Sequence, residues 1–408
     1  MKIRSLTVFF APRYPPRASQ LAPLGSFAAA AKAAFEAAGY EVQTLRLATT
    51  PFPRWVKPLT QSRAVEAAVA LEALATEAGF GYVSLGPALP EILESYSFVP
   101  DMLAATENAF LSGVIAEKKA GIHMQALTAC ADIIQKAALL EADGFANLRF
   151  AALANVPAGS PFLPAAYHAG GPSAFAIGTQ AADLAVAAFE GAGSVAQGSR
   201  ILTESIQQHA QALSKVSRRV AKPSKLSFGG IDFSLAPFPE ESESLGTAFE
   251  RMGVSAVGMH GSLAAAAILT QAIDAAKFPR AGFNGLLLPV LEDATLARRA
   301  AQGVLTISDL LMYSALCGAG LDTLPLAGST RPEELSALLL DLAALALRLD
   351  KPLTARLMPI PGKAAGDQTS FDFPFFANSR LMELKSEPLK NALASSQTVF
   401  LDRKRSKK

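Results

Sequence analysis

The sequence contains few cysteines and almost no excess of charge of either sign. Cys130 and Cys317 are its only cysteines among 408 residues, and they form no C-x-x-C or zinc-knuckle spacing. This predicts neither a disulfide framework nor a structural zinc site, and it fits a reducing, cytoplasmic compartment. The 37 basic and 35 acidic residues leave a formal charge of +2. So small a charge generates no long-range field, and we expect no nucleic-acid partner.

Long uninterrupted apolar runs are also missing. The stretch 6–11 stops at Pro12, which is too short for the core of a signal peptide. Charged residues interrupt the later stretches 263–276 and 335–349, so we expect no membrane span. The chain is nevertheless 50% apolar and only 18% charged. This composition favours a large interior or an additional interface between identical chains, that is, a homo-oligomer.

Several well-known functional motifs are absent as well. The sequence has no G-x-G-x-x-G, H-E-x-x-H or G-x-S-x-G pattern, so it gives no support to a nucleotide oxidoreductase, a zincin or a typical α/β hydrolase. Gly362 and Lys363 resemble the end of a phosphate-binding loop. However, Leu357 occupies the position of the required first glycine, and Ala364 that of the required Ser or Thr. We therefore expect no nucleotide cofactor.

What the chain does contain is an alternation of short β-rich runs with Ala-rich helical stretches, as in parallel strands joined by crossover helices. We predict strands at 3–10, 41–48, 82–85, 109–116, 148–156, 228–233, 285–291, 321–326 and 355–360. We predict helices at 26–38, 63–78, 123–142, 174–189, 198–219, 263–276, 295–301, 307–316 and 332–349. This alternation indicates one large α/β body over residues 1–400, built as a barrel or a wide sheet, with a weak internal boundary at 221–225 and a basic, solvated tail at 401–408.

Six longer blocks carry a family resemblance. They are RLATTPFPRW (46–55), PFLPAAYH (161–168), GIDFSLAP (230–237), GLLLPVLED (285–293), YSALCGAGLD (313–322) and PIPGK (359–363). Together and in this order they resemble domain-of-unknown-function family 711, also called uncharacterised protein family 0210. Thr50 and Ala327 stand where Asn and Pro are expected.

The resemblance implies an α/β fold similar to the ten-stranded barrel of the pyruvate formate-lyase type glycyl-radical enzymes, in which a loop enters the barrel. It does not imply their activity, because a fold alone does not carry chemistry and the chain has no Arg-Val-x-Gly-Tyr motif near its end. The family has no established function. Its bacterial members are often accompanied by a small ACT-domain protein, which makes such a protein a candidate partner.

Cys317 is the first candidate for chemistry. It follows the predicted helix 307–316, and the negative end of a helix dipole raises the pKa of a thiol. A nucleophilic thiolate there would need a neighbouring cation. The alternative is that Cys317 is a small buried hydrophobe and the glycines after it stop the helix.

The second candidate is the loop 159–171, which is rich in glycine and proline. Backbone amides near Ser160 would cradle an anion, with Tyr167 beside it and His168 as a proton donor or metal ligand. Alternatively, Tyr167 and His168 fill a buried polar corner.

Carboxylates near the ends of predicted strands form the third group, and strand ends are where reacting groups converge in α/β folds. They are Asp232, Glu292, Asp293 and Asp322. With His168 they would hold a divalent cation. Alternatively, Glu292 and Asp293 cap the helix that follows them. Arg356 and Lys363 would form an anion clamp, unless they are solvated surface charges.

From these residues we expect an enzyme that acts on a small anionic metabolite in a barrel-centred pocket. Catalysis is assigned to Cys317, His168, Asp232 and Asp322, substrate binding to Ser160, Tyr167, Arg356 and Lys363, and a divalent metal to Glu292 and Asp293. The competing hypothesis is a non-catalytic metabolite-binding or regulatory protein that works with an ACT-domain partner.

Overall fold

The computed structural model describes residues 1–317 and 319–401, except for the side chain of Cys317. Its strands form one mixed ten-stranded sheet. They are β1 (Lys2–Phe10), β2 (Val42–Thr49), β3 (Tyr82–Ala88), β4 (Ala109–Glu117), β5 (Gly121–Ile122), β6 (Phe150–Ala154), β7 (Ala174–Gln180), β8 (Ser227–Ala236), β9 (Gly320–Ala327) and β10 (Leu353–Ile360).

The strand order is β8-β7-β1-β2-β3-β4-β6-β10-β9, and β5 pairs with β4 beside this path. Parallel ladders join β1, β2, β3, β4 and β6 in that order, and also join β7 to β8 and β9 to β10. Antiparallel ladders join β1 to β7 and β6 to β10. The first strand of the chain therefore lies inside the sheet, and the last strands lie at or near its edge.

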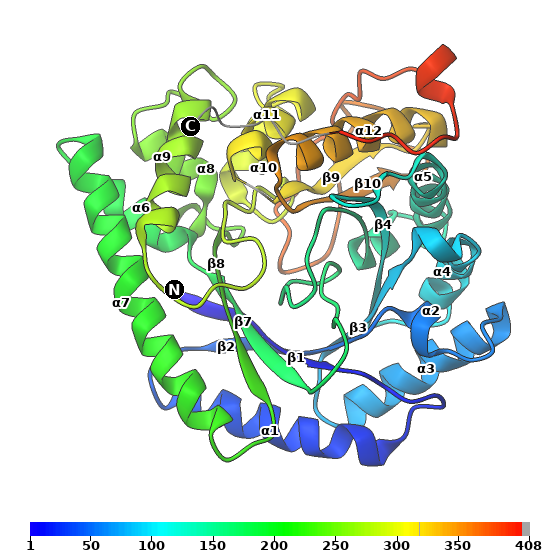
Figure 1. The fold of residues 1–408 in the computed structure, drawn as a ribbon. Helices are drawn as coiled ribbons and strands as arrows, with labels where there is room; N and C mark the ends of the chain where they lie inside the picture. The colour runs from blue at the N-terminus through cyan, green and yellow to red at the C-terminus, as the bar shows by residue number, and fades with distance from the viewer. Residues whose placement is uncertain (318, 402–408) are drawn as a thin grey trace.

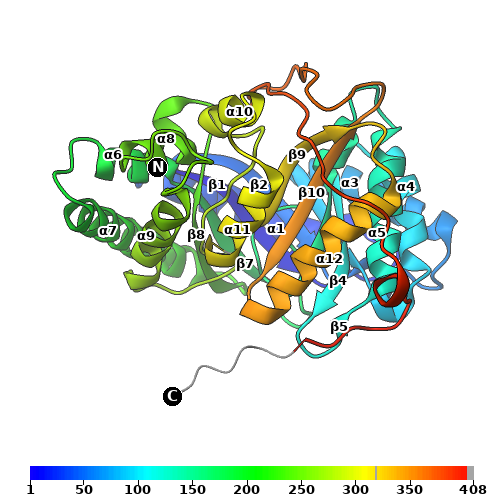
Figure 2. The ribbon, with the colours of Figure 1, turned by 90° about the horizontal axis from the view of Figure 1, so that it is seen from above.

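Helices cover the outer face of the sheet, as Figures 1 and 2 show. On β1, Ile3, Leu6 and Val8 belong to the large apolar core shared with these helices. The described helices are α1 (Ala18–Glu36), α2 (Phe52–Trp55), α3 (Gln61–Glu77), α4 (Ser95–Ala104), α5 (Met124–Ala138), α6 (Ala182–Phe189), α7 (Val195–Ala221), α8 (Leu245–Arg251), α9 (Ser262–Ala275), α10 (Ala294–Ala301), α11 (Ile307–Cys317) and α12 (Pro332–Leu349).

The other face of the sheet surrounds a loop. This inner loop, residues 155–173, connects β6 to β7 and lies in the middle of Figure 1. Its Pro161 carbonyl accepts hydrogen bonds from the hydroxyls of Ser5 (3.2 Å) and Thr7 (2.7 Å). The Ala166 carbonyl accepts another from Ser84 (2.7 Å). All three buried hydroxyls donate to carbonyls of the loop, so loop and sheet fix each other.

The predicted closed barrel is not confirmed, because no continuous ladder joins the edge strands β8 and β9 among the described residues. Residues 280–289 lie between these edges and make single bridges, Leu235 to Leu286 on β8 and Pro289 to Asp322 on β9. The prediction of a strand at 285–291 is therefore wrong. Pro289 has no N–H to donate, which limits a regular ladder here.

The predicted helix 174–189 is wrong in its first half, which forms β7. The alanines of this segment suggested a helix, but β7 has ladders on both sides, with β1 and β8. Phe175 and Ile177 face the helices, while Ala176 packs against the inner loop. Tertiary pairing overrides helix propensity here.

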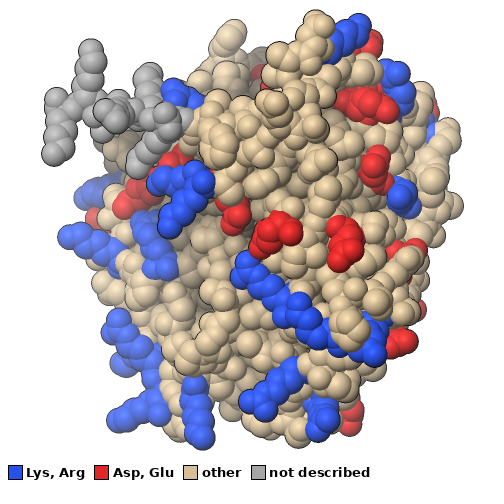
Figure 3. Space-filling model, turned by 45° about the vertical axis from the view of Figure 1, so that its right-hand side comes forward, with Lys and Arg blue, Asp and Glu red and all other residues tan. Residues whose placement is uncertain are grey.

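Two further predictions concern the connections and the end of the chain. Residues 221–225, the predicted weak boundary, join α7 to β8. The predicted basic tail lies outside the described residues, apart from Leu401. None of the helices in the described ranges has the length and apolarity needed to cross a membrane. On the face in Figure 3, charges of both signs are separated by wide uncharged areas.

The hydrogen bond between Thr7 and Pro161 gives the first prediction. Thr7→Val removes a buried donor without a large change of volume, so we expect the free energy of unfolding to fall by about 1–2 kcal/mol. Urea denaturation measures this loss, and Thr7→Ser, which keeps the hydroxyl, serves as the control. Equal stability of Thr7→Val and the wild type would contradict the role of this contact.

Candidate functional site

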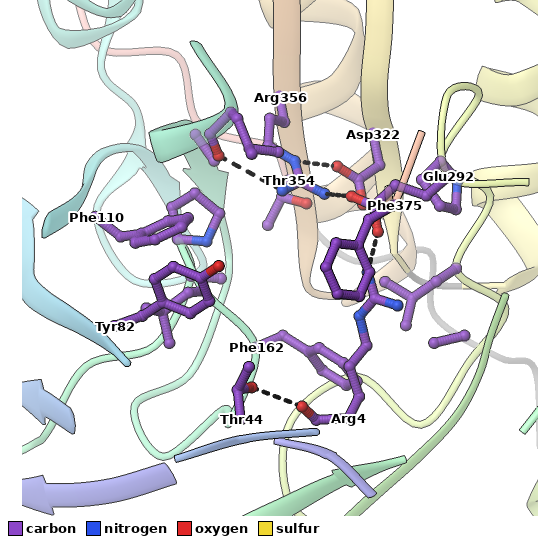
Figure 4. Close-up of a pocket in the computed structure, with 18 of the residues that line it drawn as sticks. Arg4, Thr44, Tyr82, Phe110, Phe162, Glu292, Asp322, Thr354, Arg356 and Phe375 are labelled. Carbon is purple, nitrogen blue, oxygen red and sulfur yellow. Dashed lines mark hydrogen bonds and ion pairs between the residues drawn. The ribbon is translucent and has the colours of Figure 1, made fainter. Parts of the chain in front are cut away.

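A cavity of about 100 Å³ lies between the inner loop and the strands β1, β2, β9 and β10 (Figure 4). Its described lining includes five charged side chains, Arg4, Arg46, Glu292, Asp322 and Arg356. The rest of the lining is mainly apolar and aromatic, with Tyr82, Phe110, Leu148, Phe162, Leu163, Phe283, Leu287, Phe373 and Phe375 among its members. Charges in such surroundings are poorly solvated, so their pairing determines what the cavity can bind.

A β-bulge aims Arg4 into this cavity. The pairing of β1 with β7 shifts between Ile3 and Ser5. Ile3 and Leu6 face the helices, whereas Arg4 and Ser5, which lie between them, both face inward. Simple alternation would send one of the two outward. An extra residue in one strand redirects a side chain in this way.

Arg4 and Arg356 share the carboxylate of Glu292. Arg4 Nη2 contacts Glu292 Oε2, and Arg356 Nη2 donates to Glu292 Oε1 at 2.7 Å. Arg356 Nε also donates to Asp322 Oδ1 at 2.5 Å. The dashed lines of Figure 4 follow this chain of four side chains. We call it the ion-pair network.

A second bulge positions the other half of the network. The register of β9 with β10 shifts so that Asp322 and Thr323 lie opposite Arg356. Thr323 has a φ of 40°, which is rare for a β-branched residue. Its hydroxyl accepts a hydrogen bond from the Leu291 amide at 3.3 Å. Backbone strain of this kind is concentrated at functional sites.

The two carboxylates of the network differ in acidity. Burial acts to raise the pKa of Glu292, but Arg4, Arg356 and Arg46 together bring it below its ordinary value. For Asp322, burial raises the pKa and outweighs the attraction of Arg356, while Glu292 raises it further. Two adjacent carboxyls whose pKa values are pushed apart are suited to acid and base roles.

Among the residues that the structure describes, no carboxylate forms an ion pair with Arg46. Its Nε donates to Thr44 Oγ1 at 2.8 Å, and its guanidinium lies 5.8 Å from the centre of the Tyr82 ring. Among the described residues, no acceptor bonds its two terminal nitrogens. Burial, and then the positive charge of Arg4, lower the pKa of Arg46 to about 9. Arg46 is thus a cation at neutral pH whose terminal N–H groups remain available.

Sequence reasoning missed Arg4, Arg46 and Tyr82. A signal was present, because Arg4 and Arg46 interrupt strands that are otherwise largely apolar or hydroxylated. A charge in the middle of a buried strand requires a partner, so it marks a candidate site.

Of the ten predicted site residues, Glu292, Asp322 and Arg356 line this cavity. Asp232 lies outside its lining and organises the backbone. It accepts hydrogen bonds from the Ser234 hydroxyl (2.6 Å) and from the Phe283 and Asn284 amides (2.6 and 2.9 Å). Asp232 thereby holds the segment 281–285 against β8.

Asp293 is the N-cap of α10 and accepts from the amides of Thr295 and Leu296. It also accepts from the Leu245 amide at the start of α8 at 2.7 Å. This is the capping geometry that we gave as an alternative for Asp293. Within residues 1–317 and 319–401, no group of three or more His, Cys, Asp or Glu side chains is placed to hold a metal ion. Metal binding by Glu292 and Asp293 stays a prediction.

The inner loop carries Ser160, Tyr167 and His168. His168 lines a separate cavity beside Phe9 and Gly282. Burial lowers the pKa of His168 although backbone carbonyls favour its charged form. The Tyr167 hydroxyl donates to the Val156 carbonyl at 2.9 Å, and burial raises its pKa to about 12.

The buried Ser160 Oγ and His168 Nε2 have no hydrogen-bond partner in the described part of the chain. None of Ser160, Tyr167 and His168 lines the cavity that holds the ion-pair network.

The last two predicted residues lie elsewhere. Lys363 is partly buried, and its Nζ donates to the Gln368 carbonyl at 2.6 Å and to Ser370 Oγ at 3.2 Å. It does not line the cavity that holds Arg356. Cys317 ends α11, and its side chain lies outside the described part of the structure.

Asp232 gives the second prediction. Burial raises its pKa to about 6, above the value of ~3.9 in an unfolded chain. Between these values the folded protein keeps a proton that the unfolded chain has released. Its contribution to stability is therefore full below about pH 4 and is lost as the pH rises toward about 6. The stability of the wild type minus that of the non-titrating variant Asp232→Asn should fall by up to roughly 3 kcal/mol over this interval. Urea unfolding at several pH values measures the difference, and a flat or rising difference would contradict the assignment.

Comparison with known proteins identifies the family. Residues 1–379 match the model of the family described as Uncharacterised ACR (DUF711). A UPF0210 protein of Pyrobaculum arsenaticum is 33% identical over 356 residues, which cover 81% of this chain and 76% of that protein. A UPF0210 protein of Syntrophobacter fumaroxidans is 31% identical over 353 residues, which cover 82% of this chain and 77% of its own. The family resemblance of the six sequence blocks is thus confirmed, and the chain belongs to the uncharacterised DUF711 family.

Proposed function

We propose that the protein is an enzyme that binds a small anionic metabolite in the cavity beside the ion-pair network, with Arg46 as the main anchor. The observation that carries this proposal is the pair of terminal Arg46 nitrogens, which have no acceptor among the described residues although Arg46 lines a largely apolar cavity. A guanidinium offers a planar fork of donors that matches a carboxylate. An anion bound there would supply the missing counter-charge.

Charge balance supports the same conclusion. Three arginines and two carboxylates line the cavity, so its described lining carries a net charge of +1 when all five are ionised. The two carboxylates are already bonded to Arg4 and Arg356. Arg46 therefore carries the excess positive charge. It lies in surroundings where electrostatic attraction is stronger than in water.

Proton transfer is assigned to Asp322. Its pKa is raised while that of the neighbouring Glu292 is lowered. This places the proton-exchanging role on Asp322 and a fixed negative charge on Glu292. Asp322 lines the same cavity as Arg46, so a ligand anchored by Arg46 lies within the same small space.

A non-catalytic binding role with an ACT-domain partner would use the same anchor. It differs only at Asp322, whose 2.5 Å bond to Arg356 is also compatible with a purely structural role. Binding of an anion without any dependence of chemistry on Asp322 would favour this alternative.

We also propose that the sheet corresponds to the barrel that the family resemblance implies. The single bridges that residues 280–289 make with β8 and β9 support this proposal. They bring the two edges of the sheet to opposite sides of one short segment, next to the cavity.

Anion binding yields the third prediction. Ligands of the native state raise the melting temperature, so we expect small carboxylate salts to stabilise the protein beyond the effect of sodium chloride at equal ionic strength. Arg46→Met should weaken this binding about 10- to 100-fold, because a charge-assisted hydrogen bond is lost. The control is Arg54→Met, which alters an exposed arginine paired with Glu91. If both variants bind carboxylates as the wild type does, Arg46 is not the anchor.

The role of Asp322 yields the fourth prediction. Incubation with 2-oxobutyrate in D₂O should exchange the protons next to the ketone, and NMR follows the deuterium incorporated. Asp322→Asn should slow the exchange at least about 100-fold, while carboxylate binding, read by thermal shift, persists. Retained binding with no protein-dependent exchange in the wild type would support the non-catalytic alternative instead.

A further inference from the structure

The cavity also carries information about the class of its ligand, and this inference rests on the proposed function. We infer that the ligand is a monocarboxylate with a short aliphatic body. Dianions, phosphate and aromatic acids are disfavoured.

The net charge of the cavity lining favours a ligand with a single negative charge. One negative charge neutralises the net charge of +1 on the described lining. A second anionic group on the same ligand would approach Glu292 or Asp322, which are already ionised or bonded to arginine. Like charges in a poorly solvated space repel strongly. Glu292 therefore disfavours the binding of dianions.

The hydrogen-bond donors of the lining that have no described partner also favour a carboxylate. Besides the terminal nitrogens of Arg46, the Tyr82 hydroxyl has no hydrogen-bond partner among the described residues, and it points toward the middle of the cavity in Figure 4. The Tyr82 ring is held edge-on against Phe110, with the ring centres 5.2 Å apart. A guanidinium and one hydroxyl suffice for the two oxygens of one carboxylate.

The size of the cavity and the polarity of its wall favour a short aliphatic body. Most of the uncharged side chains of the wall are apolar, among them Phe110, Phe162 and Leu287. The cavity volume of about 100 Å³ is smaller than the roughly 150 Å³ of an engineered apolar cavity that holds benzene. A compact body of a few aliphatic carbons therefore matches this space better than the larger body of an aromatic acid such as phenylacetate.

Titration of the full chain with five probes tests this inference. Isothermal titration calorimetry would compare isobutyrate, isovalerate, succinate, inorganic phosphate and phenylacetate at constant ionic strength. We expect the two branched monocarboxylates to bind at least about tenfold more tightly than the other three. Succinate, phosphate or phenylacetate binding as tightly as isobutyrate would overturn the inference while leaving the proposed function in place. If no probe binds, the proposed function fails and the inference with it.

Variants test the assigned roles directly. Glu292→Gln removes one negative charge from the lining, so the affinity for succinate relative to isobutyrate should rise about tenfold. Glu250→Gln is the matched control, since Glu250 pairs with Arg299 and lies outside the cavity lining. If the affinity for succinate relative to isobutyrate is unchanged in Glu292→Gln, Glu292 does not select against dianions.

Tyr82→Phe provides a second test that does not depend on the stability of the network. It removes a hydroxyl that has no partner in the described structure, so folding should be unaffected. We expect isobutyrate to bind about tenfold more weakly. Unchanged isobutyrate affinity would show that Tyr82 does not contact the carboxylate.

Discussion

The ion-pair network is the constraint on which the rest of the site depends. Glu292 and Asp322 are buried, and the guanidinium groups of Arg4 and Arg356 bond to them. Buried charges are tolerated only when they are paired and hydrogen-bonded, and removing one partner leaves the other uncompensated. The network therefore ties β1, at the start of the chain, to β9 and β10 near its end, and it fixes the segment that carries Glu292 between them.

Two backbone irregularities make this pairing geometrically possible. The bulge at Arg4 turns inward a side chain that regular alternation would send outward, and the bulge at Asp322 and Thr323 does the same on the opposite side. The inner loop closes the space between them through its bonds to Ser5, Thr7 and Ser84. Sheet, bulges and loop together leave a small apolar cavity with one guanidinium in excess. That excess follows from the residues that line the cavity.

Much of the fold follows from the sequence, because strands such as β1 and β4 and helices such as α5 and α12 carry strong apolar patterns. β7 could not be predicted from the sequence, because its alanines favour a helix. Its ladders with β1 and β8 on both sides stabilise a strand instead. Three site residues, Glu292, Asp322 and Arg356, were predicted from their places near strand ends. His168 and Lys363 do not line the same cavity as these three residues. The sequence could not show this, because the conformation of a loop cannot be derived from its local pattern. Arg4 and Arg46 were missed, since bulges and cross-strand register become visible only in three dimensions.

Arg46 is the proposed cationic anchor of the ligand site. The most direct measurement is an X-ray structure of the protein crystallised with a high concentration of isobutyrate. We predict a carboxylate within hydrogen-bond distance of the terminal nitrogens of Arg46 and of the Tyr82 hydroxyl, with the ion-pair network unchanged. A structure in which Arg46 pairs with a carboxylate of the protein, and in which the cavity holds no anion, would contradict it.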